Sequence, residues 1–255
     1  MKKRYLKQAL RQNQFYPVYQ PVWDEANRNF CGAEVLIRWE AKTFNKIIMP
    51  DIFIPEAEKT KLIVPITLQL IKKAFQESHK LLHKKPQFYL SFNLSPTHFE
   101  DPVFFTEFYS LCSKFNIPPH QIMLELTEIG LFNQNNEKIF NIMSKLRAEG
   151  YSLAIDDFGT GQANINYLHH FPFNYLKIDK LFISAIGTGA IIETLNKAII
   201  TMANSLKLHV IAEGVETKTQ LDYLQKNQVN YIQGWFYATA MPYQEFVKFI
   251  LTYEN

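Results

Sequence analysis

Residues 15–39 read FYPVYQPVWDEANRNFCGAEVLIRW and contain two apolar runs separated by a short polar segment. The runs FYPVYQPV (15–22) and GAEVLIRW (32–39) are rich in aromatic and β-branched residues, which favour buried strands. The polar segment between them has the length of a hairpin connection. The sequence therefore predicts that the first strand runs antiparallel to the second.

After residue 39, apolar runs alternate with amphipathic stretches of helical periodicity. The further predicted strands are 88–95, 122–128, 152–157, 175–179, 209–214 and 231–234. The predicted helices are 51–85, 103–115, 136–150, 190–207 and 217–227. Eight strands with intervening helices in 255 residues indicate an α/β fold, a TIM-like (β/α)8 barrel with its first strand antiparallel. An open, doubly wound sheet is the alternative.

The composition is that of a folded chain. Hydrophobic residues make up 47% and charged residues 20%, so we expect a packed core. The net charge of +3, with Lys and Arg spread along the chain, argues against a nucleic-acid partner. Cys31 and Cys112 do not suggest a disulfide scaffold.

With no secretory signal or bilayer-spanning apolar run, we expect a cytoplasmic protein without a membrane partner. We expect a single domain over residues 1–255, with a core of about 14–250.

Polar residues interrupt the predicted strands near their C-terminal ends. They are Gln20, Glu34, Arg38, Asn93, Glu125, Asp156, Asp157, Lys177, Asp179, Glu213 and Gln233. Any one of them could be a cap, a turn residue or half of a surface ion pair. In a barrel, however, the C-terminal ends of the strands meet at one mouth. So many carboxylates at one mouth would need cations to offset their repulsion.

The residue types at this mouth indicate which cations these are. Oxygen ligands without a cysteine or histidine partner suit Mg²⁺ or Mn²⁺ better than Zn²⁺. The number of acids suggests two ions, a type of site suited to phosphoester hydrolysis. The glycine turns FGTGQ (158–162) and IGTGA (186–190) lack the spacing of nucleotide-binding loops, and a plain loop explains the second.

Taken together, the motifs resemble those of the EAL-domain family of bacterial cyclic di-GMP phosphodiesterases. The resemblance runs from YQPV (19–22) to QGWFYATAMP (233–242) and so covers nearly the whole chain. Between these ends lie GAEVLIRW, FIPEAEKTKLI, FNLSP, LELTE, AIDDFGTG, LKIDK and VIAEGVET, in the order of the family. The signature triplet reads Glu-Val-Leu here rather than Glu-Ala-Leu.

The resemblance implies a role for each matching residue. Metal ligands would be Glu34, Asn93, Glu125 and Asp156, with Asp157 on the second ion and Glu213 as a further carboxylate and proton acceptor. Lys177 would polarise the attacking water, and Gln233 would orient water or ligand groups. The dinucleotide would contact Gln20, Leu36 and Arg38. Glu128 and Glu216 would fix the loop 158–164, which is thought in this family to couple metal binding to dimerisation.

The implied activity is hydrolysis of cyclic di-GMP to linear 5′-pGpG with Mg²⁺ or Mn²⁺, in bacterial signalling that controls biofilm formation and motility. Ca²⁺ is expected to inhibit, because its looser coordination suits this geometry poorly. A homodimer and a regulatory protein partner are expected. The alternative is a catalytically silent module that binds cyclic di-GMP or a protein. Lys61 stands where the family usually has Gly, and Gln162–Asn164 depart from the usual loop sequence.

Overall fold

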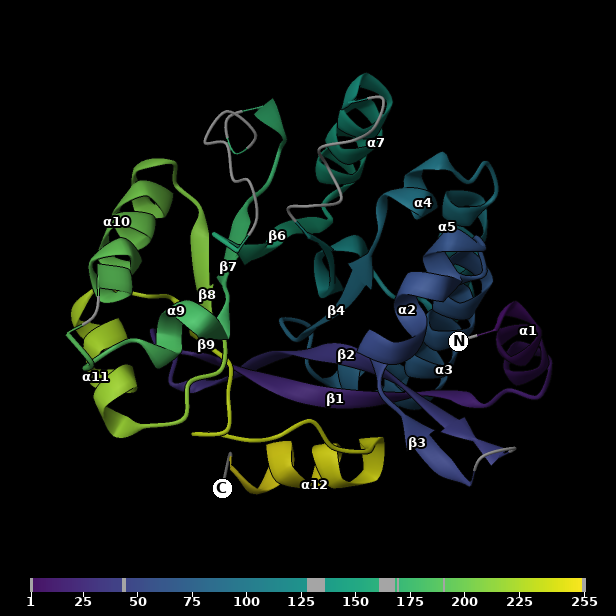
Figure 1. Cartoon of the computed structure of the whole chain (residues 1–255), viewed down its shortest axis with the longest axis horizontal. Helices are drawn as coiled ribbons and strands as arrows, with labels where there is room; N and C mark the ends of the chain where they lie inside the picture. Colours follow the sequence, from purple (N-terminus) through teal and green to yellow (C-terminus); the bar gives the residue numbers. More distant parts are fainter. Residues whose placement is uncertain are drawn as a thin grey trace.

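The strands close into a barrel. The computed structural model describes residues 2–42, 45–127, 136–160, 168, 170–189 and 191–253. One sheet has the order β1-β9-β8-β7-β6-β5-β4-β2-β3, and β1 also pairs with β2, which closes the ring (Figure 1). The strands are β1 (Phe15–Asp24), β2 (Asn29–Ala41), β3 (Lys46–Ile48), β4 (Tyr89–Leu94), β5 (Ile122–Thr127), β6 (Ser152–Phe158), β7 (Tyr175–Ile178), β8 (His209–Ala212) and β9 (Tyr231–Ile232). This closure confirms the predicted barrel and excludes the open, doubly wound sheet.

The first strand has the predicted direction. β1 is antiparallel to β2 over the register from Phe15↔Trp39 to Asp24↔Asn29, and it is also antiparallel to β9. The other neighbours in the ring are parallel, and helices supply most of the long crossover connections that parallel strands need. The three-residue strand β3, which pairs with the outer end of β2, was not predicted. Its apolar run is too short to give a strand signal.

Helices surround the barrel on its outer side (Figure 1). They are α1 (Lys3–Arg11), α2 (Pro50–Lys59), α3 (Ile63–Lys84), α4 (Pro96–Glu100), α5 (Phe104–Phe115), α7 (Asn136–Glu149), α9 (Lys180–Ser184), α10 (Ile191–Ser205), α11 (Lys218–Lys226) and α12 (Tyr243–Thr252), with a 3₁₀ turn η2 at Pro119–Gln121. Sequence patterns did not predict α1, α4, α9 and α12. In the part of the chain that the structure describes, no helix is both long enough and apolar enough to span a bilayer.

The predicted helix 51–85 is two helices, α2 and α3. The Thr60 hydroxyl donates to the Glu56 carbonyl oxygen at 2.7 Å, and Lys61 adopts a left-handed backbone with φ 58°. A left-handed residue ends an α-helix, and glycine adopts this conformation most easily. This explains why a glycine would suit position 61, and it shows that Lys61 stands at a helix break rather than within a helix.

A small apolar cluster fills the barrel beneath the mouth. It consists of Val22, Tyr89, Met123, Ala154 and Ile211, and it is separate from the main core under the helices. Three of its members lie two residues before polar residues of the mouth, Met123 before Glu125, Ala154 before Asp156, and Ile211 before Glu213. Residues two apart on a strand share a face. Buried, mostly apolar side chains therefore lie directly beneath the polar groups of the mouth.

Candidate active site

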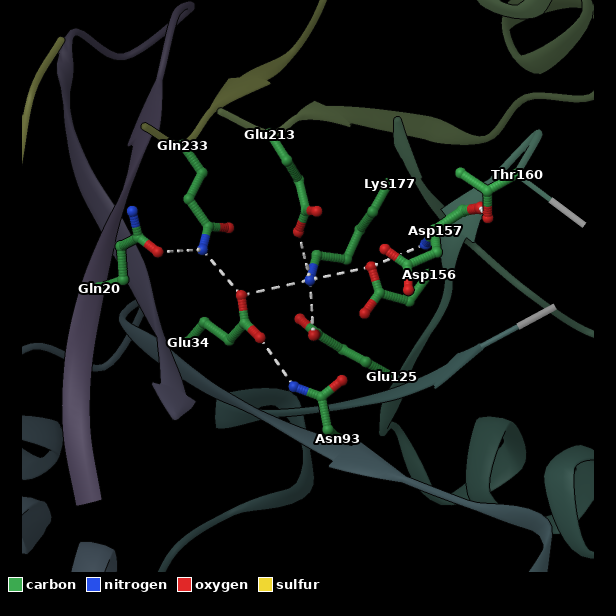
Figure 2. Close-up of polar contacts among 10 residues, drawn as sticks. All are labelled: Gln20, Glu34, Asn93, Glu125, Asp156, Asp157, Thr160, Lys177, Glu213 and Gln233. Atoms are coloured by element: carbon green, nitrogen blue, oxygen red, sulfur yellow. Dashed lines mark hydrogen bonds and ion pairs between the residues drawn. The ribbon is translucent and has the colours of Figure 1, made fainter. Parts of the chain in front are cut away.

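The polar ends of the strands meet at one mouth of the barrel, as predicted. Figure 2 shows their side chains pointing toward one another from successive strands. They are Gln20 on β1, Glu34 on β2, Asn93 on β4, Glu125 on β5, Asp156 and Asp157 on β6, Lys177 on β7, Glu213 just after β8 and Gln233 just after β9. Residues far apart in the sequence thus form one cluster, because parallel strands of a closed barrel end at the same rim.

Lys177 lies at the centre of this cluster, with its side chain 1% exposed. Its Nζ lies 2.6 Å from Glu213 Oε1, 2.7 Å from Glu125 Oε2, 3.2 Å from Asp156 Oδ1 and 3.3 Å from Glu34 Oε2 (Figure 2). Buried charges are tolerated only when they are paired. Four carboxylates surround one ammonium, so the cluster has more acid than this lysine can neutralise.

Burial opposes the charged form of each of these groups, and their pKa values reflect how far pairing offsets it. For Lys177, burial lowers the pKa, but the surrounding carboxylates outweigh it and raise the pKa well above its usual range. Burial and carboxylate repulsion raise the pKa of Glu125 to about 8 and that of Glu213 well above its usual range, despite Lys177. Burial alone would raise the pKa of Glu34, but the charge of Lys177 and hydrogen bonds from the Gln233 and Asn93 amides outweigh burial and lower the pKa. Burial and mutual repulsion therefore disfavour the charged forms of Glu125 and Glu213, which a divalent cation would favour.

Amide side chains hold Glu34 in a fixed orientation. Asn93 Nδ2 donates to Glu34 Oε1 at 2.7 Å, and Gln233 Nε2 donates to Glu34 Oε2, also at 2.7 Å. Gln233 Nε2 also donates to Gln20 Oε1 at 3.2 Å. Because Asn93 uses its nitrogen toward Glu34, its carbonyl oxygen is the atom suited to bind a cation.

The backbone at Asp157 allows two adjacent carboxylates, those of Asp156 and Asp157, to face the same mouth. Neighbouring residues of a strand normally point to opposite faces. Asp157, however, has a left-handed backbone with φ 54°, and the pairing of β6 with β7 is irregular between Ile155 and Phe158. The Asp157 amide donates to Asp156 Oδ1 at 3.0 Å, and the Thr160 hydroxyl donates to the Asp157 carbonyl oxygen at 2.8 Å. This local turn brings both carboxylates to the mouth while Asp157 is still within β6.

The donor set suits a divalent cation. One carboxylate oxygen each from Asp156, Asp157 and Glu213 lies within 4.8 Å of the other two. Burial, and repulsion from Asp156 and Asp179, raise the pKa of Asp157 to about 6. Hard cations such as Mg²⁺ and Mn²⁺ prefer carboxylate and carbonyl oxygens of this kind. The chemistry of these residues therefore fits a metal ion.

A cavity of about 360 Å³ adjoins the cluster, since Asn93 and Asp157 are among its lining residues. Leu36, predicted to contact a dinucleotide, lines it too. Arg38 follows on the same face of β2, half-buried, and its Nη1 donates to the Ile37 carbonyl oxygen at 2.8 Å. The cavity walls from α2 and α3 were not foreseen, because their residues belong to the apolar faces of helices and give no separate signal.

The predicted loop contacts stay predictions. Glu216 lies exposed between β8 and α11, where its backbone amide donates to Gln220 Oε1 at 2.7 Å. Glu128 and residues 161–164 of the loop, including Gln162–Asn164, lie outside the described residues. Asp179 is a helix cap, since its side chain accepts from the Leu181 amide at the start of α9.

The second glycine turn is not a phosphate cradle. The amides of Gly187 and Gly189 both donate to Glu193 Oε2, at 3.2 Å each. A carboxylate of the chain itself thus satisfies the two donors, which agrees with the interpretation of IGTGA as a plain loop.

Comparison with known proteins agrees with this geometry. A family model described as EAL domain matches residues 3–240. The "Probable cyclic di-GMP phosphodiesterase PdeG" of Escherichia coli (strain K12) is 33% identical over 97% of this chain and 48% of its own length. The structure "PaMucR Phosphodiesterase, c-di-GMP complex" has a TM-score of 0.88 at 31% identity and covers 95% of this chain and 98% of its own. The "EAL Enzyme Bd1971", bound to cAMP and cyclic-di-GMP, has a TM-score of 0.89 at 27% identity, over 97% of this chain and 67% of its own.

The chain spans about half the length of the curated relatives that it matches. The match nevertheless includes every strand of the barrel and every residue of the acidic cluster. Because the family model matches most of the sequence and the barrel agrees with that of a solved relative, the chain belongs to the EAL domain family.

Proposed function

We propose that this chain is a metal-dependent phosphodiesterase that hydrolyses cyclic di-GMP to linear 5′-pGpG and works as one EAL domain over residues 1–255. The observation that carries the proposal is the complete cluster at the mouth, in which Lys177 contacts Glu34, Glu125, Asp156 and Glu213. The names of the relatives PdeG and PaMucR support the choice of reaction and substrate.

The residues that would hold two ions are Glu34, Asn93, Glu125 and Asp156, with Asp157 serving the second ion and Glu213 as a further carboxylate. When bound there, Mg²⁺ or Mn²⁺ would supply polarisation of a water molecule and stabilisation of charge on the phosphate. The cluster fits this role because its carboxylates have only one ammonium to balance them.

The other residues would position the reactants. Lys177 would donate to the attacking water or to a phosphate oxygen, and Glu213 would accept the proton that the water loses. As the new P–O bond forms, the bond from phosphorus to the 3′ oxygen breaks, which opens the ring. Gln233 and Gln20, joined by a hydrogen bond of 3.2 Å, would orient water and substrate at the rim. Leu36 and Arg38 would contact the dinucleotide, Arg38 through a phosphate oxygen.

The direct test is incubation of the purified chain with cyclic di-GMP, with chromatography to resolve the products. We expect 5′-pGpG with Mg²⁺ or Mn²⁺, no product after chelation with EDTA, and inhibition by Ca²⁺. Binding of cyclic di-GMP without turnover in any of these ions would instead establish the silent module. Full activity in EDTA would contradict the metal-dependent mechanism.

We propose further that the chain acts as a cytoplasmic homodimer that responds to a regulatory protein. Large apolar side chains are exposed on α9 and α10: Leu181 is 52%, Ile191 80% and Leu195 47% exposed. Exposed apolar groups gathered on neighbouring helices are typical of interaction surfaces. Leu195→Glu should shift the chain to a monomer in analytical ultracentrifugation. Wild-type protein that sediments as a monomer at all concentrations would contradict the dimer.

A further inference from the structure

The cavity beside the acidic cluster has the mixed apolar and polar lining of a ligand pocket. It measures about 360 Å³ and lies between β2, β4 and the helices α2 and α3. Much of its wall is apolar and includes Leu36, Ile54, Ile63 and Phe92. Ligand pockets of this kind combine apolar walls with a few polar groups that fix orientation. Since Asn93 and Asp157 also line the cavity, a group bound in it would lie next to the acidic cluster.

The polar groups on the α2 and α3 side of this cavity are few, and most of them are occupied. His98 is buried, and its ring contacts Ser95 and Thr67, with Nε2 3.0 Å from Thr67 Oγ1. Burial lowers the pKa of His98 to about 4, so the ring is neutral at physiological pH. This part of the wall is therefore a fixed, uncharged network.

Glu58 is the exception on this side of the cavity. It projects from α2, is half-buried, and accepts a hydrogen bond from the Ser95 side chain. Among the residues that the structure describes, no basic side chain forms an ion pair with it. A carboxylate has about four lone-pair sites, so one bond from Ser95 leaves most of its acceptor capacity unused. Glu58 is thus available to accept hydrogen bonds from a ligand.

Guanine presents two adjacent donors that match a carboxylate, N1–H and the exocyclic N2 amine. Adenine has an acceptor at N1 and a single amine at C6, and hypoxanthine keeps N1–H but lacks the N2 amine. We propose that Glu58 is a specificity-determining residue that accepts hydrogen bonds from N1–H and N2–H of one guanine in this cavity. The inference rests on the proposed function, because it takes cyclic di-GMP as the substrate whose phosphate lies at the acidic cluster.

The test compares Glu58→Gln with wild type on cyclic di-GMP, cyclic di-IMP and cyclic di-AMP. A pocket built to pair with ligand donors discriminates strongly against analogues that lack them. We expect kcat/KM for cyclic di-GMP to fall about tenfold to a hundredfold in the variant. For cyclic di-IMP the fall should be smaller, so the preference for guanine over hypoxanthine shrinks about tenfold. Turnover of cyclic di-AMP should be unchanged or raised, because a glutamine amide can pair with the adenine edge.

Two control variants separate base recognition from a structural role. Glu56→Gln makes the same change on the same helix at a residue that does not line the cavity, and it should leave all three substrates unaffected. Ser95→Ala removes the intramolecular partner of Glu58. If Glu58 only anchored the turn before α4, both Ser95→Ala and Glu58→Gln would slow all three substrates equally, and the inference would be overturned.

Failure of the inference and failure of the proposed function give different results. Wild type that hydrolyses cyclic di-GMP while Glu58→Gln keeps an unchanged guanine preference would overturn the inference alone. If wild type shows no turnover, titration calorimetry of cyclic di-GMP and cyclic di-IMP in Ca²⁺ gives a second readout. A guanine preference in binding that Glu58→Gln reduces supports the inference even in a silent module. Equal binding of both dinucleotides, or none, overturns it.

Discussion

Asp156→Asn should reduce turnover of cyclic di-GMP by about a thousandfold or more while leaving the metal-free protein as stable as wild type or more stable. Asp156 Oδ1 lies 3.2 Å from Lys177 Nζ, and one oxygen of this carboxylate lies within 4.8 Å of carboxylate oxygens of Asp157 and Glu213. Asparagine has the same shape but no charge, so it weakens the hold on a cation. Burial and repulsion from Glu34 raise the pKa of Asp156 in the wild type, so its charged form is disfavoured there. Asparagine carries no charge and relieves this repulsion.

The measurement pairs steady-state kinetics with thermal unfolding in EDTA. Asp222→Asn is the matched control, since Asp222 is exposed on α11 and its ion pair with Lys218 lies on the helix surface. That variant should keep wild-type activity. Near-normal activity of Asp156→Asn at saturating Mn²⁺ would show that this carboxylate is not part of the metal site. Inactivity accompanied by a large loss of stability would show that Asp156 acts through folding instead.

Lys177→Met should destabilise the metal-free protein more than any other single change in the cluster. Methionine fills a similar volume, but the four carboxylates around Nζ lose their common cation. Removing one partner of a buried ion pair costs about 3–5 kcal/mol, and uptake of protons by Glu125 and Glu213 reduces that cost. For a chain of this size we expect the melting temperature to fall by about 5–15 °C. Activity should fall as well, since the proposed donor to water is gone.

Calorimetry with and without Mn²⁺ distinguishes this electrostatic cause from a packing defect. A divalent cation can neutralise the orphaned carboxylates, so Mn²⁺ should raise the melting temperature of Lys177→Met more than that of wild type. Lys177→Arg serves as control, because it keeps the charge and should lose less stability. An equal response of Lys177→Met and wild type to Mn²⁺ would show that Lys177 does not balance the carboxylates as the distances indicate.

Much of the fold could be predicted because strand and helix signals are local. The apolar runs at 15–22 and 32–39 indicated a hairpin, and β1 is antiparallel to β2. The helix break at Lys61 was missed, since the apolar periodicity continues across 51–85 and only the left-handed backbone interrupts it. Helices α9 and α4 are five residues long each, too short for periodicity to appear.

The sequence by itself determined which residues could form a site. A polar residue interrupts the apolar pattern near the end of nearly every strand, and carboxylates with an amide and a lysine indicate hard cations. These are properties of residue type and spacing, which remain the same whatever the chain folds into.

The tertiary structure alone decided which of these groups meet and in what electrostatic state. Lys177 contacts Glu34 across 143 residues of sequence only because the barrel closes. Asp157 reaches the same mouth as Asp156 because one left-handed residue breaks the alternation of β6. Glu58 lines the cavity beside the cluster only because α2 packs against the barrel next to β2. Contacts, burial and pKa values depend on distances between elements, and these distances are set by packing and closure rather than by any local pattern.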